Sequence, residues 1–150
     1  MVINMKKYIN ISFMYAIAAI ACGIFYREFT KINGFSGKTA LAFTHLHMLV
    51  LGMIVFLAIA AFSVVTDLTD QKLFKPFVLL YNAALPFMVI MLFVRGIPQV
   101  LEMELSKSAS AAISGITGIA HIMMTAAIVM LFIALRNSRS TVQSSHSSKL

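Results

Sequence analysis

Four long runs of apolar residues divide the chain, and short polar segments separate them. Each run is close to the roughly 20 residues that a helix needs to cross the hydrocarbon core of a bilayer. The pattern predicts an all-α fold, an integral membrane bundle of four transmembrane helices within residues 1–136. The predicted spans are 8–26, 41–65, 74–94 and 111–135.

Turn signals mark the predicted connections. Asn33-Gly34 falls between the first two spans, and Gly96 and Pro98 fall after the third. Inside the third span, Pro86 lacks an N–H, so a kink is expected where the carbonyl of Asn82 loses its helical partner. The connections are short, so consecutive helices are expected to be antiparallel neighbours.

The two ends of the chain carry their own expectations. Lys6 and Lys7 precede the first apolar run in the manner of a signal peptide, but Ile24-Phe25-Tyr26 follows where a polar linker would be typical. We therefore expect the first run to remain as a membrane span. The serine-rich residues 137–150 are expected to form a disordered tail.

Composition supports the membrane assignment. The chain has 150 residues, of which 60% are hydrophobic and 11% charged, and its mean hydropathy is +0.91. An ordinary soluble domain is excluded. The net charge of +7 does not indicate nucleic acid, because the basic residues lie in loops and at the ends of the chain, not on one amphipathic face.

The distribution of Lys and Arg predicts the orientation in the cell membrane. Seven basic residues lie on the side of the two termini and five on the other side. Because cytoplasmic segments carry the excess of positive charge, both termini are expected in the cytoplasm. The second and fourth spans would then run in the same direction across the bilayer.

Three histidines inside the predicted spans are the main candidates for chemistry. His45 and His47 begin the second span, and His121 lies in the fourth. Ionisable side chains within a membrane are costly and are usually functional. At 100° per residue, His45 and His47 point about 200° apart, so one small ion could hardly be held by both. The pair suits two separate neighbours, and a haem needs only one imidazole on each side of its iron.

Small and mildly polar residues surround these histidines. Ser114, Thr117, Gly118 and Thr125 share a helix face with His121, and a flat macrocycle could lie against them. Gly52 lies on the same face of the second span as His45 and, without a side chain, leaves space there in the same way. The alternative is close helix packing through small residues, with the histidines as hydrogen-bonding partners between helices.

Other polar or soft side chains have more ordinary explanations. Arg95, at the end of the third span, could pair with a haem propionate or simply snorkel to the interface, which is the reading we favour. The methionines in the spans are typical of packing, so copper is less expected than haem. Cys22 is the single cysteine, and we interpret it as a small buried apolar residue.

Two resemblances follow from these motifs. The segment from Thr44 to Gly52 resembles the His-x-His helix of haem-copper oxidase subunit I, in which two histidines serve two haems on opposite sides of one helix. The element from Asn82 to Pro86 is loosely similar to an Asn-x-x-x-Pro element of that superfamily. The oxidase subunit has twelve helices in three arcs of four, which implies that a four-helix relative could assemble as a homotrimer.

The whole chain is similar to a small bacterial membrane family, domain of unknown function 2871. The resemblance rests on four spans, His-x-His in the second, and Gly-x-x-Gly-x-x-His ending at His121 in the fourth. The chain lacks the further histidines of a copper centre, so oxygen reduction is not expected and the protein need not be an enzyme.

Three functions remain open at this point. The leading hypothesis is a membrane protein that binds b-type haem through His121 and either His45 or His47, for electron transfer, haem sensing or haem handling. The rival is a transporter or copper- or zinc-handling protein whose histidines line a pathway. The third is a structural subunit without a cofactor. The expected partners are the lipid bilayer and further copies of the chain.

Overall fold

A computed structural model describes residues 2–141, and its architecture confirms the predicted fold class. Four helical spans are long and apolar enough to cross a membrane, and the described residues form no β-strand. In chain order the elements are α1 (Val2–Ile32), η1 (Ala40–Phe43), α2 (Thr44–His47), η2 (Met48–Ile54), α3 (Val55–Val65), η3 (Leu68–Asp70), α4 (Phe74–Val100) and α5 (Lys107–Asn137). The second span, Ala40–Val65, comprises η1, α2, η2 and α3.

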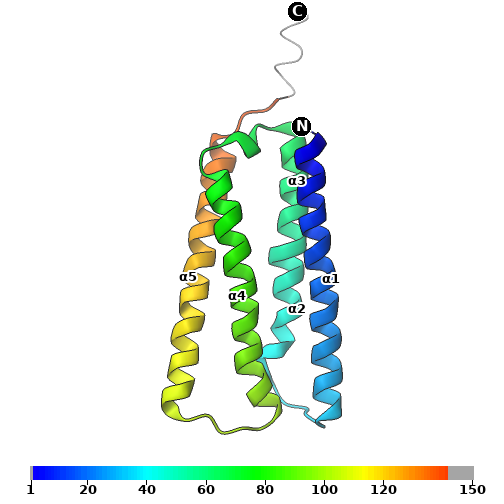
Figure 1. Cartoon of the computed structure of the whole chain (residues 1–150), viewed down its shortest axis with the longest axis vertical. Coiled ribbons are helices and arrows are strands. Elements are labelled where there is room, and N and C mark those ends of the chain that lie inside the picture. The colour runs from blue at the N-terminus through cyan, green and yellow to red at the C-terminus, as the bar shows by residue number, and fades with distance from the viewer. Residues whose placement is uncertain (1, 142–150) are drawn as a thin grey trace, which may run out of the picture.

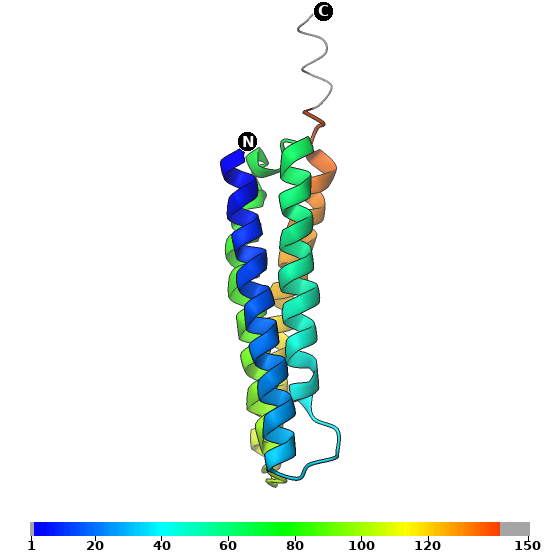
Figure 2. The same ribbon diagram turned by 90° about the vertical axis from the view of Figure 1, so that its right-hand side faces the viewer.

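The four spans run up and down as an elongated bundle (Figure 1). Backbones approach most closely within two pairs, α1 with the second span and α4 with α5. The second span and α5 both run away from the end that holds the α1–η1 loop, so they are parallel to each other (Figures 1 and 2).

Aromatic side chains hold the two pairs together in the core. Tyr8 of α1 meets Phe74 of α4 edge-on, with ring centroids 5.5 Å apart. Deeper in the bundle, Phe56 of α3 stacks on Tyr15 of α1 at 5.7 Å and contacts Tyr81 of α4 edge-on at 5.7 Å. These rings are buried. Their size keeps the two backbone pairs apart while filling the space between them.

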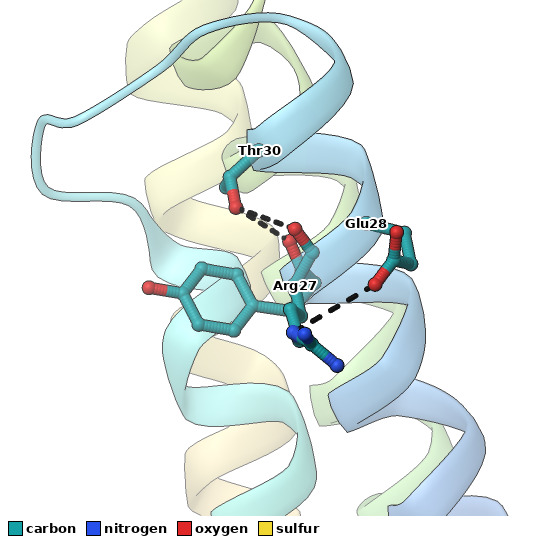
Figure 3. Close-up of polar contacts among 4 residues, drawn as sticks. Arg27, Glu28 and Thr30 are labelled. Atoms are coloured by element: carbon teal, nitrogen blue, oxygen red, sulfur yellow. Dashed lines mark hydrogen bonds and ion pairs between the residues drawn. The ribbon is translucent and has the colours of Figure 1, made fainter.

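The first helix extends beyond the predicted span because its polar end bonds to itself. The Thr30 hydroxyl lies 2.9 Å from the carbonyl oxygen of Tyr26 and 3.1 Å from that of Arg27. Arg27 and Glu28 form an exposed ion pair at 3.7 Å (Figure 3). The helix ends where predicted by the turn signal, with Gly34 in the left-handed region at φ 62°.

The third span also extends further than expected, and here the turn prediction was wrong. Helix α4 continues through Gly96 and Pro98 to Val100. Gly96 is a close-contact position, because a Cβ there would lie 2.6 Å from the backbone nitrogen of Leu41. The Thr39 hydroxyl donates to the Gly96 carbonyl at 3.0 Å. The segment that leads into the second span therefore docks on the end of α4.

The start of the C-terminal tail is tied to the end of α3. The backbone N–H of Arg139 donates to the Asp67 carboxylate at 2.6 Å, and the Asp67 N–H donates to the Arg139 carbonyl at 3.1 Å. Residues 137–150 were expected to be disordered, but the start of this segment makes an ordered contact with Asp67. Residues 142–150 lie outside the described part of the chain.

Candidate functional site

A seven-residue π-helical segment, η2, follows His47 directly. Side chains from two other helices bond to its carbonyl groups. The Tyr81 hydroxyl of α4 donates to the Leu51 carbonyl at 2.7 Å, and the Ser12 hydroxyl of α1 donates to the Met53 carbonyl at 2.8 Å. Irregular backbone at membrane depth requires such partners, and π segments often occur at functional sites.

His45 and His47 lie on different sides of the second span, as helix geometry predicts. His45 packs toward α1, where a Cβ at Gly23 would lie 3.7 Å from the His45 Cβ. Its Nδ1 is buried and has no hydrogen-bond partner among the described residues. His47 instead lines an open groove of about 290 Å³ with Phe43, Leu46, Val50 and Leu51. The two imidazoles therefore have different neighbours and cannot clasp one ion.

The groove beside His47 lies next to a second groove, which reaches α5. Leu51 lines both, and the second groove, of about 250 Å³, is also lined by Ile128 of α5. His121 precedes Ile128 by seven residues, which is two helical turns, so the two side chains share a face of α5. His47 and His121 therefore face the same side of the bundle, where the second span and α5 run parallel.

The two imidazoles on this side make the same hydrogen bond. Nδ1 of His47 lies 2.8 Å from the carbonyl oxygen of Phe43, and Nδ1 of His121 lies 2.9 Å from that of Thr117. A carbonyl can only accept, so Nδ1 is the donor in both rings and Nε2 keeps its lone pair for a neutral imidazole. A metal-binding histidine typically has this arrangement, with one ring nitrogen fixed and the other free to coordinate.

Arg95 points to the same face of α5. Its guanidinium donates to the Ser114 hydroxyl at 2.9 Å, in an exposed contact between α4 and α5. Ser114 precedes His121 by seven residues, roughly 10 Å along the helix axis. Between Ser114 and His121, a Cβ added at Gly115 or Gly118 would meet nothing within 4 Å. Gly118 therefore leaves an open surface beside His121, as the small-residue stripe predicts.

Gly52 has a different role from the expected cofactor contact. A Cβ at this position would lie 2.5 Å from Cγ of Tyr15, so the glycine makes room for an aromatic ring of α1. It shares the α1-facing side of the second span with His45, as its spacing predicts. The same ring hydrogen-bonds through its hydroxyl to Asn82 Oδ1 at 2.8 Å.

No group of three or more His, Cys, Asp or Glu side chains that could hold a metal ion occurs among residues 2–141. A structural zinc site normally takes four such ligands and a catalytic site three.

A comparison with protein families assigns the chain. The family described as "Protein of unknown function (DUF2871)" matches residues 5–138. The chain belongs to this family. No curated protein and no solved structure matches it, so the similarity to haem-copper oxidase subunit I has no support beyond the motifs themselves.

Sequence reasoning missed the side chains that support the π segment. The bonds that Tyr81 and Ser12 make to the second span were not predicted. No local signal in the second span marks the π-helical backbone. Hydroxyl side chains within a neighbouring span could have indicated these bonds, since intramembrane hydroxyls often form hydrogen bonds between helices.

Proposed function

We propose that this protein binds b-type haem on the side shared by the second span and α5, with Nε2 of His47 and Nε2 of His121 as axial ligands. The observation that carries the proposal is the matched orientation of these two rings, each fixed through Nδ1 by the carbonyl four residues before it. Bound haem would supply a one-electron iron couple, suited to electron transfer, haem sensing or haem handling.

The surroundings have the character that haem requires. The groove beside His47 is lined by apolar side chains, and such walls suit the faces of a macrocycle. Arg95 of α4 contacts Ser114, which shares a face of α5 with His121, and its guanidinium can receive a propionate in place of the Ser114 hydroxyl. His45 is left out of this set because it packs toward α1.

We further propose that the protein works as a homo-oligomer, specifically a homotrimer, in the cytoplasmic membrane. The side that carries His121 is open in the single chain, with Gly118 and Thr125 exposed on the same face of α5, so a second copy could cover a bound haem. Both termini are proposed to be cytoplasmic, because Lys6, Lys7 and further basic residues gather at their end of the bundle.

The test is the absorption spectrum of the purified protein, oxidised and then reduced, together with its haem and metal content. We expect a sharp Soret band and reduced-state α and β bands. His47→Ala and His121→Ala should each remove most of the bound haem, whereas the matched control His45→Ala should keep it. Loss of haem in the control alone would overturn the ligand assignment.

The same preparation decides between the proposal and its rivals. Stoichiometric zinc or copper without haem bands would favour a metal-handling protein. No cofactor after expression with haem supplied would favour a structural subunit. In that case the histidines would act as hydrogen-bonding groups between helices.

A further inference from the structure

A second site lies on the opposite side of the bundle, between α1 and α4, and does not involve the histidines. We propose that it binds an anionic phospholipid, with the phosphate between Lys7 and Lys75 and an acyl chain in the apolar cleft one turn further along. The proposal is independent of haem binding.

The headgroup end is a pocket of about 280 Å³ where α1 and α4 meet. Its lining includes Lys7 and Lys75, with the rings of Tyr8 and Phe74 as its floor. The Lys7 ammonium lies 5.9 Å from the centroid of the Tyr8 ring, and Tyr8 packs edge-on against Phe74. Neither lysine has an ion-pair partner within residues 2–141. Two unpaired cations above an aromatic floor fit an anionic group at the membrane surface.

An apolar cleft of about 450 Å³ begins one helical turn below this pocket. Ile11, Met14 and Ala18 of α1 line it, with Met48 of the second span. Ile11 follows Lys7 by four residues, so pocket and cleft lie along the same face of α1. A cationic pocket that continues into an apolar cleft has the polarity of a phospholipid, from its phosphate to its acyl chain.

Asn10 lies at the junction of the two parts. Its side chain lines the cleft, is exposed, and has no hydrogen-bond partner among the described residues. An unpaired carboxamide facing lipid is costly. The ester carbonyl groups of a phospholipid lie just below its phosphate and would accept from the Asn10 amide.

The charge at this end of the bundle favours an anionic lipid. Six basic residues of the described chain lie here, and only Asp67 and Asp70 oppose them. Helix α4 begins at this end with no acidic residue in its first turn. Its N-terminus therefore adds the positive end of the helix dipole, which attracts phosphate.

The experiment measures phosphatidylglycerol bound to the protein in phosphatidylcholine nanodiscs that contain a small fraction of it. Lys7→Gln with Lys75→Gln should weaken the preference by about 30-fold, equivalent to about 2 kcal/mol for two lysines. The matched control is Lys6→Gln with Lys72→Gln, which removes the same charge from the same end but outside the pocket. This control should keep most of the preference.

Two further experiments test the binding of the acyl chain in the apolar cleft and the integrity of the fold. Ala18→Phe should fill the cleft and reduce phosphatidylglycerol binding, and glycerol phosphate without acyl chains should compete poorly. If the double glutamine variant fails to fold, Lys7→Arg with Lys75→Arg should retain binding and Lys75→Gln alone should reduce it. Equal loss in the pocket variant and the control would overturn the proposal, as would full binding in the pocket variant. Effective competition by glycerol phosphate would show that the pocket binds an anion without an acyl chain in the cleft, and this result would also overturn the proposal.

Discussion

The Tyr81 hydroxyl of α4 donates to the Leu51 carbonyl at 2.7 Å, inside the π-helical segment that follows His47. This bond joins the two backbone pairs of the bundle at the point where the second span departs from α-helical geometry. It also fixes the backbone one turn beyond a proposed iron ligand. The local shape of the second span thus depends on a residue of another helix.

Removing this hydroxyl should destabilise the fold. In Tyr81→Phe the ring remains packed while the Leu51 carbonyl loses its side-chain partner, which should cost about 1–3 kcal/mol. The free energy of unfolding in detergent would be measured by denaturant titration followed by circular dichroism. Tyr26→Phe is the control, because the Tyr26 hydroxyl has no hydrogen bond among the described residues. An unchanged unfolding free energy in Tyr81→Phe would mean that the π segment does not need this bond.

A methyl group at Gly52 should be poorly tolerated. Its Cβ would lie 2.5 Å from Cγ of Tyr15, so α1 and the second span would have to separate or the buried ring would have to move. We expect a loss of about 1–3 kcal/mol, typical of overpacking. Gly115→Ala is the matched control because its Cβ meets nothing within 4 Å. Thermal unfolding of both variants would test this, and equal midpoints would contradict the close contact.

Replacement of Arg95 should change the bound haem without removing it. Arg95→Gln takes away a positive charge near the proposed propionate site, which should favour the ferric state and lower the reduction potential. Arg27→Gln is the control, since Arg27 is in an exposed ion pair near the end of α1, and α1 and α4 finish at the same end of the bundle (Figure 1). A spectroelectrochemical titration would report the potential. If both variants leave it unchanged, Arg95 does not contact the cofactor.

The contact between Asp67 and Arg139 should stabilise only the residues immediately around it. Asp67→Asn keeps the size of the side chain but weakens the charge-assisted bond from the Arg139 N–H. Hydrogen exchange should speed up at Arg139 while the unfolding temperature changes little, because the contact is exposed. Asp70→Asn serves as the control. Faster exchange throughout α3 would indicate that the tether supports the whole helix end.

Some features of the site could be read from the sequence because they follow from helix periodicity. The opposite directions of His45 and His47 depend only on 100° per residue, and the structure shows them with different neighbours. The open surface at Gly118 follows from the spacing of small residues near His121. Gly96 was misread because glycine marks both turns and close helix contacts, and only the neighbouring Leu41 distinguishes them.

The sequence by itself determined the four spans, the parallel course of the second and fourth, and the absence of an ordinary soluble fold. These properties follow from hydropathy and segment length, since a membrane leaves a chain few ways to satisfy its backbone. Only the tertiary structure decided that His45 packs against α1, that Arg95 reaches Ser114, and that Tyr81 and Ser12 bond to the π segment. Each of these contacts joins residues of different helices, and their pairing depends on how the helices pack, which no local pattern encodes.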